Sequence, residues 1–262
     1  MKIYKAYAKV NIFLKITGKR EAYHEMISRF MRVESLYDKL SFVPKDDTDA
    51  KVNNFKIIGD FSCETEQNTI YKAYFALKEA TQSQKLEQLM QTHAIKVEKN
   101  IPAFAGLGGG SSDAATYLKM CNEVLHLDLS LNELALIGVK VGADVPFFIY
   151  GYKSANVSGI GEVVEEFDEP LLEIQTYTPD VKISTPLVYK IYREDFYNPV
   201  DGFEREKLKQ VTSKEALNSM SAVEANDLFE PALRGYKELK NHYKSGYHFS
   251  GSGSSFFRVK ED

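Results

Sequence analysis

PAFAGLGGGSSDAATYL, residues 102–118, places four glycines and two serines within seven positions and then continues into an apolar-periodic run. Glycines remove side chains where a backbone must approach a bulky group, and they let a loop take positive φ angles. A helix that begins after such a loop presents unpaired N–H groups and the positive end of its dipole. We therefore expect a phosphate-binding loop that opens a helix capped by Ser111 and Ser112, rather than a turn that serves packing alone.

Two common phosphate loops do not fit these residues. A Walker A loop has the form GxxxxGK[ST], and no lysine follows the glycines here. A dinucleotide-binding loop has the form GxGxxG, and Ser111 stands where its third glycine would be. The HRD and DFG motifs of protein kinases are also absent from the sequence. The loop thus predicts another class of phosphate-binding protein.

The overall composition excludes several classes of protein. The 262 residues carry a formal net charge of −4 and no basic run, so we do not expect nucleic acid as a partner. No apolar run reaches the roughly 18 residues of a membrane span, and the lysine-rich N-terminus does not resemble a signal peptide. Cys63 and Cys121, the two cysteines, fit a reducing compartment better than a disulfide or zinc site. We expect a cytoplasmic protein without membrane contact.

The clearest strand lies near the N-terminus. Residues 5–16 alternate between apolar and polar side chains at most positions, as in a β-strand with two different faces. Lys9 and Asn11 share the polar face, roughly 7 Å apart by the rise of a strand.

Hydrophobic periodicity predicts a mixture of strands and helices over the rest of the first 150 residues. The expected elements are extended chain over 27–43, a charged loop of unassigned role over 44–54, a helix over 68–80 and a strand near 93–101. A helix then follows up to residue 125, with Ala114, Leu118, Cys121 and Leu125 buried. The next helix begins at Ser130 with a Glu133 capping box and buries Leu131, Leu134, Gly138 and Val141, and GADVPFFIYG, residues 142–151, is expected to form a turn and a buried strand.

The chain after residue 150 is expected to form a second unit, which gives domains at 1–152 and 153–262. Its predicted elements are a hairpin over 154–167 with Gly159 and Gly161 in the turn, strands near 171–183, helices near 186–193, 213–220 and 224–241, and a strand–turn–strand over 247–259, with 195–215 unassigned. Because strands and helices do not alternate regularly, the fold class expected is α+β.

Three stretches resemble the GHMP kinase superfamily, the group of galacto-, homoserine-, mevalonate- and phosphomevalonate kinases. The loop is similar to its signature of Pro, three residues and Gly-Leu-Gly-(Ser/Gly)-Ser-Ser. AYAKVNIFLKI at 6–16 resembles its N-terminal strand motif, and SGSGSSFF at 250–257 its C-terminal glycine motif. The resemblance spans nearly the whole chain. It implies a two-domain fold with an N-terminal ATP-binding domain, a C-terminal α/β-sandwich domain and an active site in the cleft between them.

Further details resemble one branch of the superfamily. YHE at 23–25, the extra glycine of GLGGGSSDAA and GADVPFF at 142–148 are similar to the kinases that act on a cytidine-diphosphate-linked methylerythritol. This resemblance implies transfer of the γ-phosphoryl group of ATP, with Mg²⁺, to the 2-hydroxyl of that small molecule, in the non-mevalonate pathway to isoprenoid precursors. It assigns no protein side chain as a metal ligand, and we expect a monomer or a weak homodimer.

The same resemblance assigns ATP to the loop and to two residues nearby. Asn68 and Lys99 are implied along the adenine and ribose pocket, although a helix cap and a surface position suit them equally well. The loop residues implied to bind ATP are Pro102, Ala103, Phe104, Ala105, Gly106, Leu107, Gly108, Gly109, Gly110, Ser111 and Ser112.

Asp144 is implied as the base that takes the proton from the acceptor hydroxyl. Lys9 is implied as the cation that steadies the transferring phosphoryl group, and Asn11 as a residue that positions the acceptor. A turn cap at Asp144 and a solvated strand face at Lys9 are the ordinary alternatives.

The cytosine is implied to stack on Tyr23, with His24 at its edge and Tyr189 on its second face, and with Thr185 nearby. The turn before Tyr23 reads KREAYHE and lacks the Asp-Gly usual in this branch, so its conformation is open.

Two other functions are compatible with these motifs. The acceptor could be an alcohol of the homoserine or mevalonate type, which needs no aromatic sandwich. A non-catalytic nucleotide-sensing relative would be expected to lack the base or the lysine, and both are present here.

Overall fold

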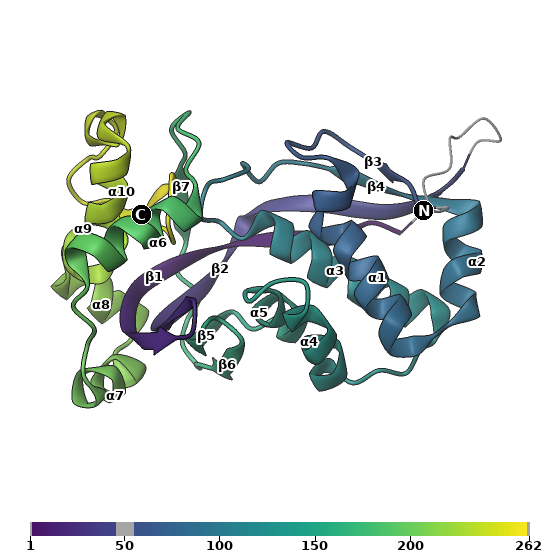
Figure 1. Ribbon diagram of the computed structural model, residues 1–262, viewed down its shortest axis with the longest axis horizontal. Helices are drawn as coiled ribbons and strands as arrows, with labels where there is room; N and C mark the ends of the chain where they lie inside the picture. The colour runs from purple at the N-terminus through teal and green to yellow at the C-terminus, as the bar shows by residue number, and fades with distance from the viewer. Residues whose placement is uncertain (1, 46–54, 261–262) are drawn as a thin grey trace. The chain divides into compact units, whose positions relative to one another are not determined.

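The computed structural model describes residues 2–45 and 55–260 (Figure 1). Most of the charged segment expected as a loop, residues 46–54, therefore lies outside the described residues. The described chain forms two compact units. Unit 1 comprises Met1–Ala8, Leu36–Ala103 and Gly109–Gly151, and unit 2 comprises Lys9–Ser35, Phe104–Gly108 and Tyr152–Asp262. The predicted domain boundary at 152/153 stays a prediction, since unit 2 also takes in two earlier segments.

Two long strands, β1 (Tyr4–Arg20) and β2 (Tyr23–Pro44), contribute residues to both units. Within unit 1, the last part of β2 pairs antiparallel with β4, from Lys39 opposite Glu98 to Pro44 opposite His93, and β3 adds parallel to β4. The other elements of unit 1 are β3 (Ile57–Ile58), a 3₁₀ turn (Thr65–Gln67), α1 (Thr69–Thr81), α2 (Gln84–Thr92), β4 (His93–Glu98), α3 (Gly109–Leu125), α4 (Leu131–Val139) and α5 (Val145–Tyr150).

The helices of unit 1 begin and bury their faces for reasons visible in the sequence. The predicted capping box of α4 is present, with Ser130 accepting from the Glu133 N–H and Glu133 accepting from the Ser130 N–H. The predicted apolar stripe of α3 is confirmed, because Ala114, Leu118, Cys121 and Leu125 are all buried. Helices α1, α3, α4 and α5 pack together (Figure 1).

The predictions for α5 and for the buried face of α4 are wrong. GADVPFFIYG contains the helix α5 instead of a strand, because Pro146 fits the first turn of a helix and Gly151, at φ +72°, ends it. An apolar run this short does not distinguish the two structures. In α4, Leu131 is 48% exposed and Val141 lies beyond the helix end, so the buried stripe holds only Leu134 and Gly138 of the four expected residues.

Unit 2 contains two antiparallel arrangements of strands. The first part of β2 pairs with β5, from Met26 opposite Gly159 to Met31 opposite Ser154, and β5 pairs with β6. Strand β9 lies between β7 and β8. The elements are β5 (Ser154–Gly159), β6 (Val163–Glu166), β7 (Ile174–Tyr177), α6 (Thr185–Ile191) with a π-helical turn (Tyr192–Phe196), α7 (Gly202–Gln210), α8 (Ser213–Ser219), α9 (Ala222–Ala225), α10 (Phe229–Gly235), a 3₁₀ turn (Lys237–Asn241), β8 (His248–Phe249) and β9 (Phe256–Val259).

The hairpin at β5–β6 and the closing strand–turn–strand are confirmed, and so is the α+β class, but the helix expected over 224–241 is wrong. That segment is broken into α9, α10 and a 3₁₀ turn. Asn226 interrupts it because its side chain donates to the carbonyls of Phe249 and Gly251 and accepts from the Leu228 N–H. Of the strands expected near 171–183, only Ile174–Tyr177 is paired.

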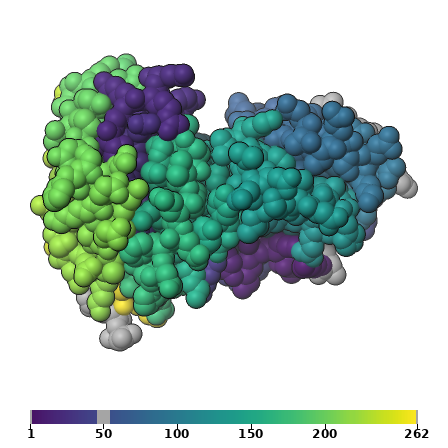
Figure 2. Space-filling view, turned by 90° about the horizontal axis from the view of Figure 1, so that it is seen from below, coloured from purple at the N-terminus to yellow at the C-terminus, as the bar shows by residue number. Residues whose placement is uncertain are grey.

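Strand β1 is buried on both of its faces in its central part. Its apolar side is no more than 3% exposed, at Ala6, Ala8, Val10, Ile12, Leu14 and Ile16. On the other side, Lys9 is 3% exposed and Asn11 is 2% exposed, so the face expected to be polar is also closed to solvent. At the end of the strand, the purple tip of the β1–β2 hairpin in Figure 2 lies against green segments of unit 2, where Arg193 donates to the Ala22 carbonyl.

A buried ion pair ties the N-terminus of α8 to the strands of unit 2. Arg29 is fully buried and donates to Glu169, to the Asn156 side chain and to the Lys209 carbonyl. Glu169 also accepts from the N–H and the hydroxyl of Ser213, the first residue of α8. No helix among the residues described combines the length and apolar composition that crossing a membrane requires.

Replacing Glu169 should destabilise the protein strongly. In Glu169→Ala the Arg29 charge stays buried without its counter-ion, which costs about 3–5 kcal/mol. The measurement is the free energy of unfolding from urea titration. Glu173→Ala is the matched control, because Glu173 forms an exposed pair with Lys260 and its loss should cost less than about 1 kcal/mol. Equal losses in the two variants would contradict the role given to the buried pair.

Candidate active site

The predicted site residues divide between the two units. Asn68, Lys99, Pro102, Ala103, Gly109, Gly110, Ser111, Ser112 and Asp144 belong to unit 1. Lys9, Asn11, Tyr23, His24, Phe104, Ala105, Gly106, Leu107, Gly108, Thr185 and Tyr189 belong to unit 2.

The first half of the phosphate loop is bound to the C-terminal glycine motif. Gly106 has φ +73°, and a Cβ there would lie 2.1 Å from the carbonyl oxygen of Ser250, so no other residue fits. The Ser250 hydroxyl donates to the Gly106 carbonyl at 3.0 Å, and the Ser255 N–H donates to the Ala105 carbonyl at 3.1 Å. The two glycine motifs seen in the sequence therefore form one backbone assembly within unit 2.

The second half of the loop is the first turn of α3. This helix begins at Gly109, so Ser111 and Ser112 lie inside it, and the prediction that they cap it is wrong. Gly108, at φ +72°, turns the chain early enough for the helix to begin before the serines. The backbone packs closely here, since a Cβ on Gly109 would lie 2.9 Å from the Ile101 side chain. The first turn of α3 presents the N–H groups that a helix cannot pair internally.

Lys99 binds two carboxylates of unit 1. Its ammonium donates to Asp38 and, at 2.7 Å, to Asp113 in α3. Burial would lower the pKa of Lys99, but the carboxylates of Asp113 and Asp38 raise it overall. Burial raises the pKa of Asp113 to about 7, and the Asp38 charge adds to this while Lys99 opposes it. Lys99 thus serves as a counter-ion beneath the start of α3, close to the phosphate loop.

Asn68 caps α1. Its side-chain oxygen accepts from the Ile70 N–H at 2.9 Å, and the residue is 6% exposed. The neighbouring Thr69 hydroxyl donates to the carbonyl of Gly110 at 2.6 Å, which joins the start of α1 to the start of α3. The capping function anticipated as an alternative for Asn68 is therefore present in the structure.

Lys9 and Asn11 form a buried polar pair on β1. The Lys9 ammonium donates to the Asn11 side-chain oxygen at 2.6 Å and lies 4.4 Å from the centre of the Phe30 ring. The Asn11 amide group donates to the Ser28 hydroxyl at 2.9 Å. The Lys9 N–H also donates to the carbonyl of Leu107, so the strand is bound directly to the phosphate loop. A solvated position for Lys9 is thereby excluded.

Asp144 lies directly before the first residue of α5 in unit 1 and is partly exposed. Its backbone is already helical, and its side chain makes no capping hydrogen bond with this helix. Asp144 therefore does not cap α5 through its side chain, and its function stays a prediction. A carboxylate at the N-terminus of a short helix can accept a proton from a bound hydroxyl.

His24 lies among tyrosines in unit 2. Its ring stacks on Tyr189, with centroids 5.3 Å apart, and meets Tyr192 edge to face at 5.7 Å. Burial, with the charges of Arg193 and Lys19, lowers its pKa, so the imidazole is neutral at neutral pH. Its Nε2 atom is buried without a hydrogen-bond partner. A buried polar atom of this kind costs about 1–3 kcal/mol unless a ligand satisfies it.

Thr185 and Tyr23, the other two residues implied for the acceptor in unit 2, differ in their surroundings. Thr185, the first residue of α6, shares a hydrogen bond with Ser252 at 2.6 Å. Tyr23 is 62% exposed, and the structure stacks His24, rather than Tyr23, on Tyr189. The turn before Tyr23 contains two residues, and Glu21 takes φ +54° in place of a glycine.

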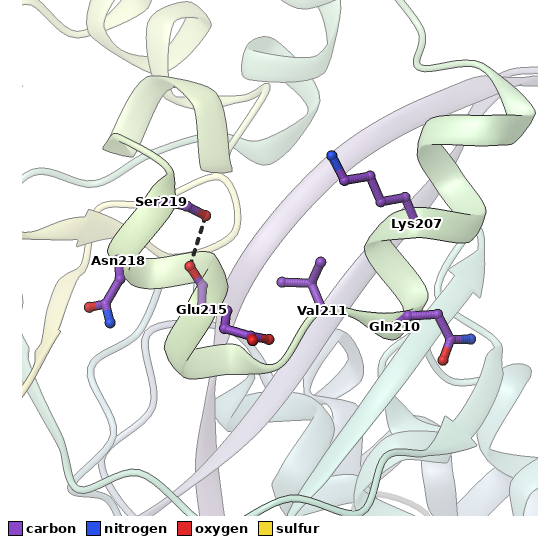
Figure 3. A pocket seen from close by; sticks show the side chains of 6 residues that line it. All are labelled: Lys207, Gln210, Val211, Glu215, Asn218 and Ser219. Atoms are coloured by element: carbon purple, nitrogen blue, oxygen red, sulfur yellow. Dashed lines mark hydrogen bonds between the residues drawn. The ribbon is translucent and has the colours of Figure 1, made fainter.

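An open surface pocket elsewhere in unit 2 contains none of the predicted residues. Figure 3 shows side chains of α7 and α8 around it, among them Lys207 and Glu215. Its lining lacks the glycine backbone and the buried polar groups that characterise the loop region.

Three residues near the predicted ones, Tyr192, Asp113 and Ser250, were given no function from the sequence. Tyr192 follows Tyr189 at helical spacing, which is a signal that could have found it. Asp113 directly follows the serines of the loop and could have been paired with a cation. Ser250 bridges the loop and β1, a contact between distant residues that no local pattern reveals.

Comparison with known proteins supports the family that the loop motif indicates. The family model for the GHMP kinases N terminal domain matches residues 68–152. The 4-diphosphocytidyl-2-C-methyl-D-erythritol kinase of Sulfurimonas denitrificans is 71% identical over 100% of this chain and 98% of its own length. The protein of that name from Sulfurovum sp. is 44% identical over 98% of both chains.

A crystal structure of a 4-(cytidine 5'-diphospho)-2C-methyl-D-erythritol kinase matches with a TM-score of 0.72 at 29% identity, covering 99% of this chain and 90% of the other. The resemblance seen in the sequence is confirmed. The chain belongs to the family of 4-diphosphocytidyl-2-C-methyl-D-erythritol kinases, ATP-dependent phosphotransferases of the GHMP kinase superfamily.

Proposed function

We propose that this chain transfers the γ-phosphoryl group of ATP to the 2-hydroxyl of 4-diphosphocytidyl-2-C-methyl-D-erythritol, in the non-mevalonate pathway to isoprenoid precursors. The products are the 2-phosphate and ADP. The observation that carries the proposal is the loop 104–112, in which glycine backbone leads directly into α3. Identity of 71% over the full chain to a kinase of that name supports the acceptor.

The loop is suited to the phosphates of ATP because it offers backbone N–H groups rather than side chains. Gly106 and Gly108 hold left-handed backbone, and α3, with 17 residues, contributes its dipole. We assign the backbone of the loop, from Pro102 to Ser112, to this function. Lys99, held by Asp38 and Asp113, supports the start of α3, and we place the adenosine near Lys99 and Asn68.

Mg²⁺ would enter together with ATP. The described residues contain no group of three or more His, Cys, Asp or Glu side chains able to hold a metal ion. Mg²⁺ that enters with ATP does not need such a group, since this ion usually keeps several waters and takes phosphate oxygens as ligands. When bound, the ion would neutralise negative charge on the phosphates.

Lys9 would stabilise the charge of the transferring phosphoryl group, and Asp144 would accept the proton of the acceptor hydroxyl. The acceptor oxygen forms a bond to the γ-phosphorus while the bond to the ADP oxygen breaks, and Asp144 takes the hydroxyl proton. Lys9 is buried and oriented by Asn11, so its charge acts at low dielectric on the transferring group. Phosphoryl transfer needs this kind of positioning more than covalent chemistry.

The cytosine would satisfy the unpaired Nε2 atom of His24 with its polar edge. Tyr189 is already oriented by its stacking on His24 and offers an aromatic face, and the exposed Tyr23 offers another. Thr185 would contact the acceptor from the start of α6. We place the reaction in the cytoplasm, consistent with the free thiols of Cys63 and Cys121, and the oligomeric state stays a prediction.

A panel of acceptors tests the function. We expect ADP release with 4-diphosphocytidyl-2-C-methyl-D-erythritol and at least about 100-fold lower kcat/KM with mevalonate or homoserine, because a site built for hydrogen bonds discriminates strongly against ligands that lack them. A preference for mevalonate or homoserine would contradict the proposal. Nucleotide binding without ADP release on any acceptor would indicate a sensing protein instead.

Asp144→Asn should lower kcat by about 10²–10⁴-fold, because the amide cannot accept the proton. The KM for ATP should stay within about twofold of the wild type, as measured by coupled ADP release over a range of ATP concentrations. Asp60→Asn, on the exposed surface of unit 1, is the control and should leave kcat unchanged. Near-normal turnover in Asp144→Asn would eliminate Asp144 as the base.

Tyr189→Ala should raise the KM for the cytidylyl acceptor about 5–150-fold, the range expected for loss of one stacking contact to a base. The KM for ATP should not change. Tyr189→Phe keeps the aromatic face and should behave like the wild type. An equal rise of both KM values in Tyr189→Ala would show a structural effect and not a contact with the cytosine.

A further inference from the structure

Phe104 has an unusual backbone and an exposed ring. Its φ is +54°, a left-handed conformation that is disfavoured for bulky residues, and its side chain is 52% exposed. The other non-glycine residues with positive φ in the described chain are polar residues in turns or at helix ends, namely Glu21, Gln82, His126 and Asp128. Glycine would take the same backbone at lower cost, and it occupies the two other left-handed positions of this loop, 106 and 108.

The surrounding loop holds Phe104 in this conformation. Its carbonyl accepts from the Ser254 N–H, and the next carbonyl, of Ala105, accepts from the Ser255 N–H. The phosphates need only backbone at this position, and burial does not compensate the strain, since half of the side chain is exposed. Strained residues that persist in this way cluster where ligands bind.

The Phe104 backbone is bound to the C-terminal glycine motif, which also contacts a residue assigned to the acceptor. Phe104 contacts Ser254, while Ser252 of the same C-terminal motif shares a hydrogen bond with Thr185. Phe104, Thr185, Lys9 and His24 all belong to unit 2, whereas Asn68 and Lys99 belong to unit 1. Through the C-terminal motif, Phe104 is thus linked to Thr185, a residue assigned to the acceptor.

We propose that the Phe104 ring is a specificity-determining residue that packs on the 2-C-methyl group of the acceptor; this rests on the function proposed above. A phenyl ring offers apolar area and no hydrogen-bonding group, which suits a methyl group and not a hydroxyl or a phosphate. A single methyl group in an apolar contact changes kcat/KM by about 10–200-fold. The ring would therefore distinguish the branched acceptor from the analogue that lacks the branch.

The test compares two acceptors, 4-diphosphocytidyl-2-C-methyl-D-erythritol and 4-diphosphocytidyl-D-erythritol, on three variants. Phe104→Gly removes both the ring and the strain, whereas Phe104→Ala removes the ring and keeps a Cβ. Gln82→Gly is the matched control, because Gln82 is an exposed residue at φ +49° that ends α1.

In the wild type we expect a preference of about tenfold or more in kcat/KM for the methylated acceptor. Both Phe104 variants should lose that preference while the KM for ATP stays within about twofold. Phe104→Gly and Gln82→Gly should both have an unchanged or higher Tm, because each relieves a left-handed residue, but only Phe104→Gly should change the acceptor kinetics.

Three outcomes would overturn the inference. The Phe104 variants could keep the preference for the methylated acceptor, or they could raise the KM for ATP instead, which would assign the ring to the nucleotide. If the wild type turns over neither cytidylyl acceptor, the proposed function itself fails, and the inference fails with it.

Discussion

The contact between Gly106 and Ser250 is the constraint on which the assembly in unit 2 depends. The two backbones approach so closely that a single added carbon would lie 2.1 Å from an oxygen. The Ser250 hydroxyl then joins the loop to β1, since it donates to the Gly106 carbonyl and accepts from the Asn11 N–H at 3.4 Å. Lys9 and Asn11 take their positions from this backbone, and the hydrogen bond from the Lys9 ammonium to the Asn11 side chain holds the buried charge.

Much of the fold follows from local sequence. The alternation of 5–16 predicts strand β1, the glycine loop predicts a helix directly after it, and the Ser130 capping box predicts the start of α4, because each reports a short-range backbone preference. The wrong predictions occur where the secondary structure depends on residues that are distant in the sequence. Six apolar residues after Asp144 fit a strand or a helix equally well, and Asn226 breaks a helical pattern only because the carbonyls of Phe249 and Gly251 lie within its reach.

The candidate site shows the same division. Residue types and spacing predicted the loop, and the resemblance to the superfamily implied Lys9 and His24, but neither indicated the groups that surround them. The resemblance implied Lys99 as a nucleotide ligand. In the structure, Lys99 binds two carboxylates that come from β2 and α3, which are far apart in sequence. The stacking of His24 on Tyr189 joins the start of β2 to α6. Such pairings depend on tertiary structure, and a single sequence carries no direct signal for them.

The interleaving of the two units limits how this chain can be divided. Strand β5 pairs with residues 26–31 of β2, more than 120 positions earlier, and the C-terminal glycine motif is bonded to the loop at 104–106. A polypeptide cut after residue 152 would leave its second piece without the neighbouring strand and without the loop. Neither fragment could serve as a portable module, so gene fusion or recombination must carry the two units together.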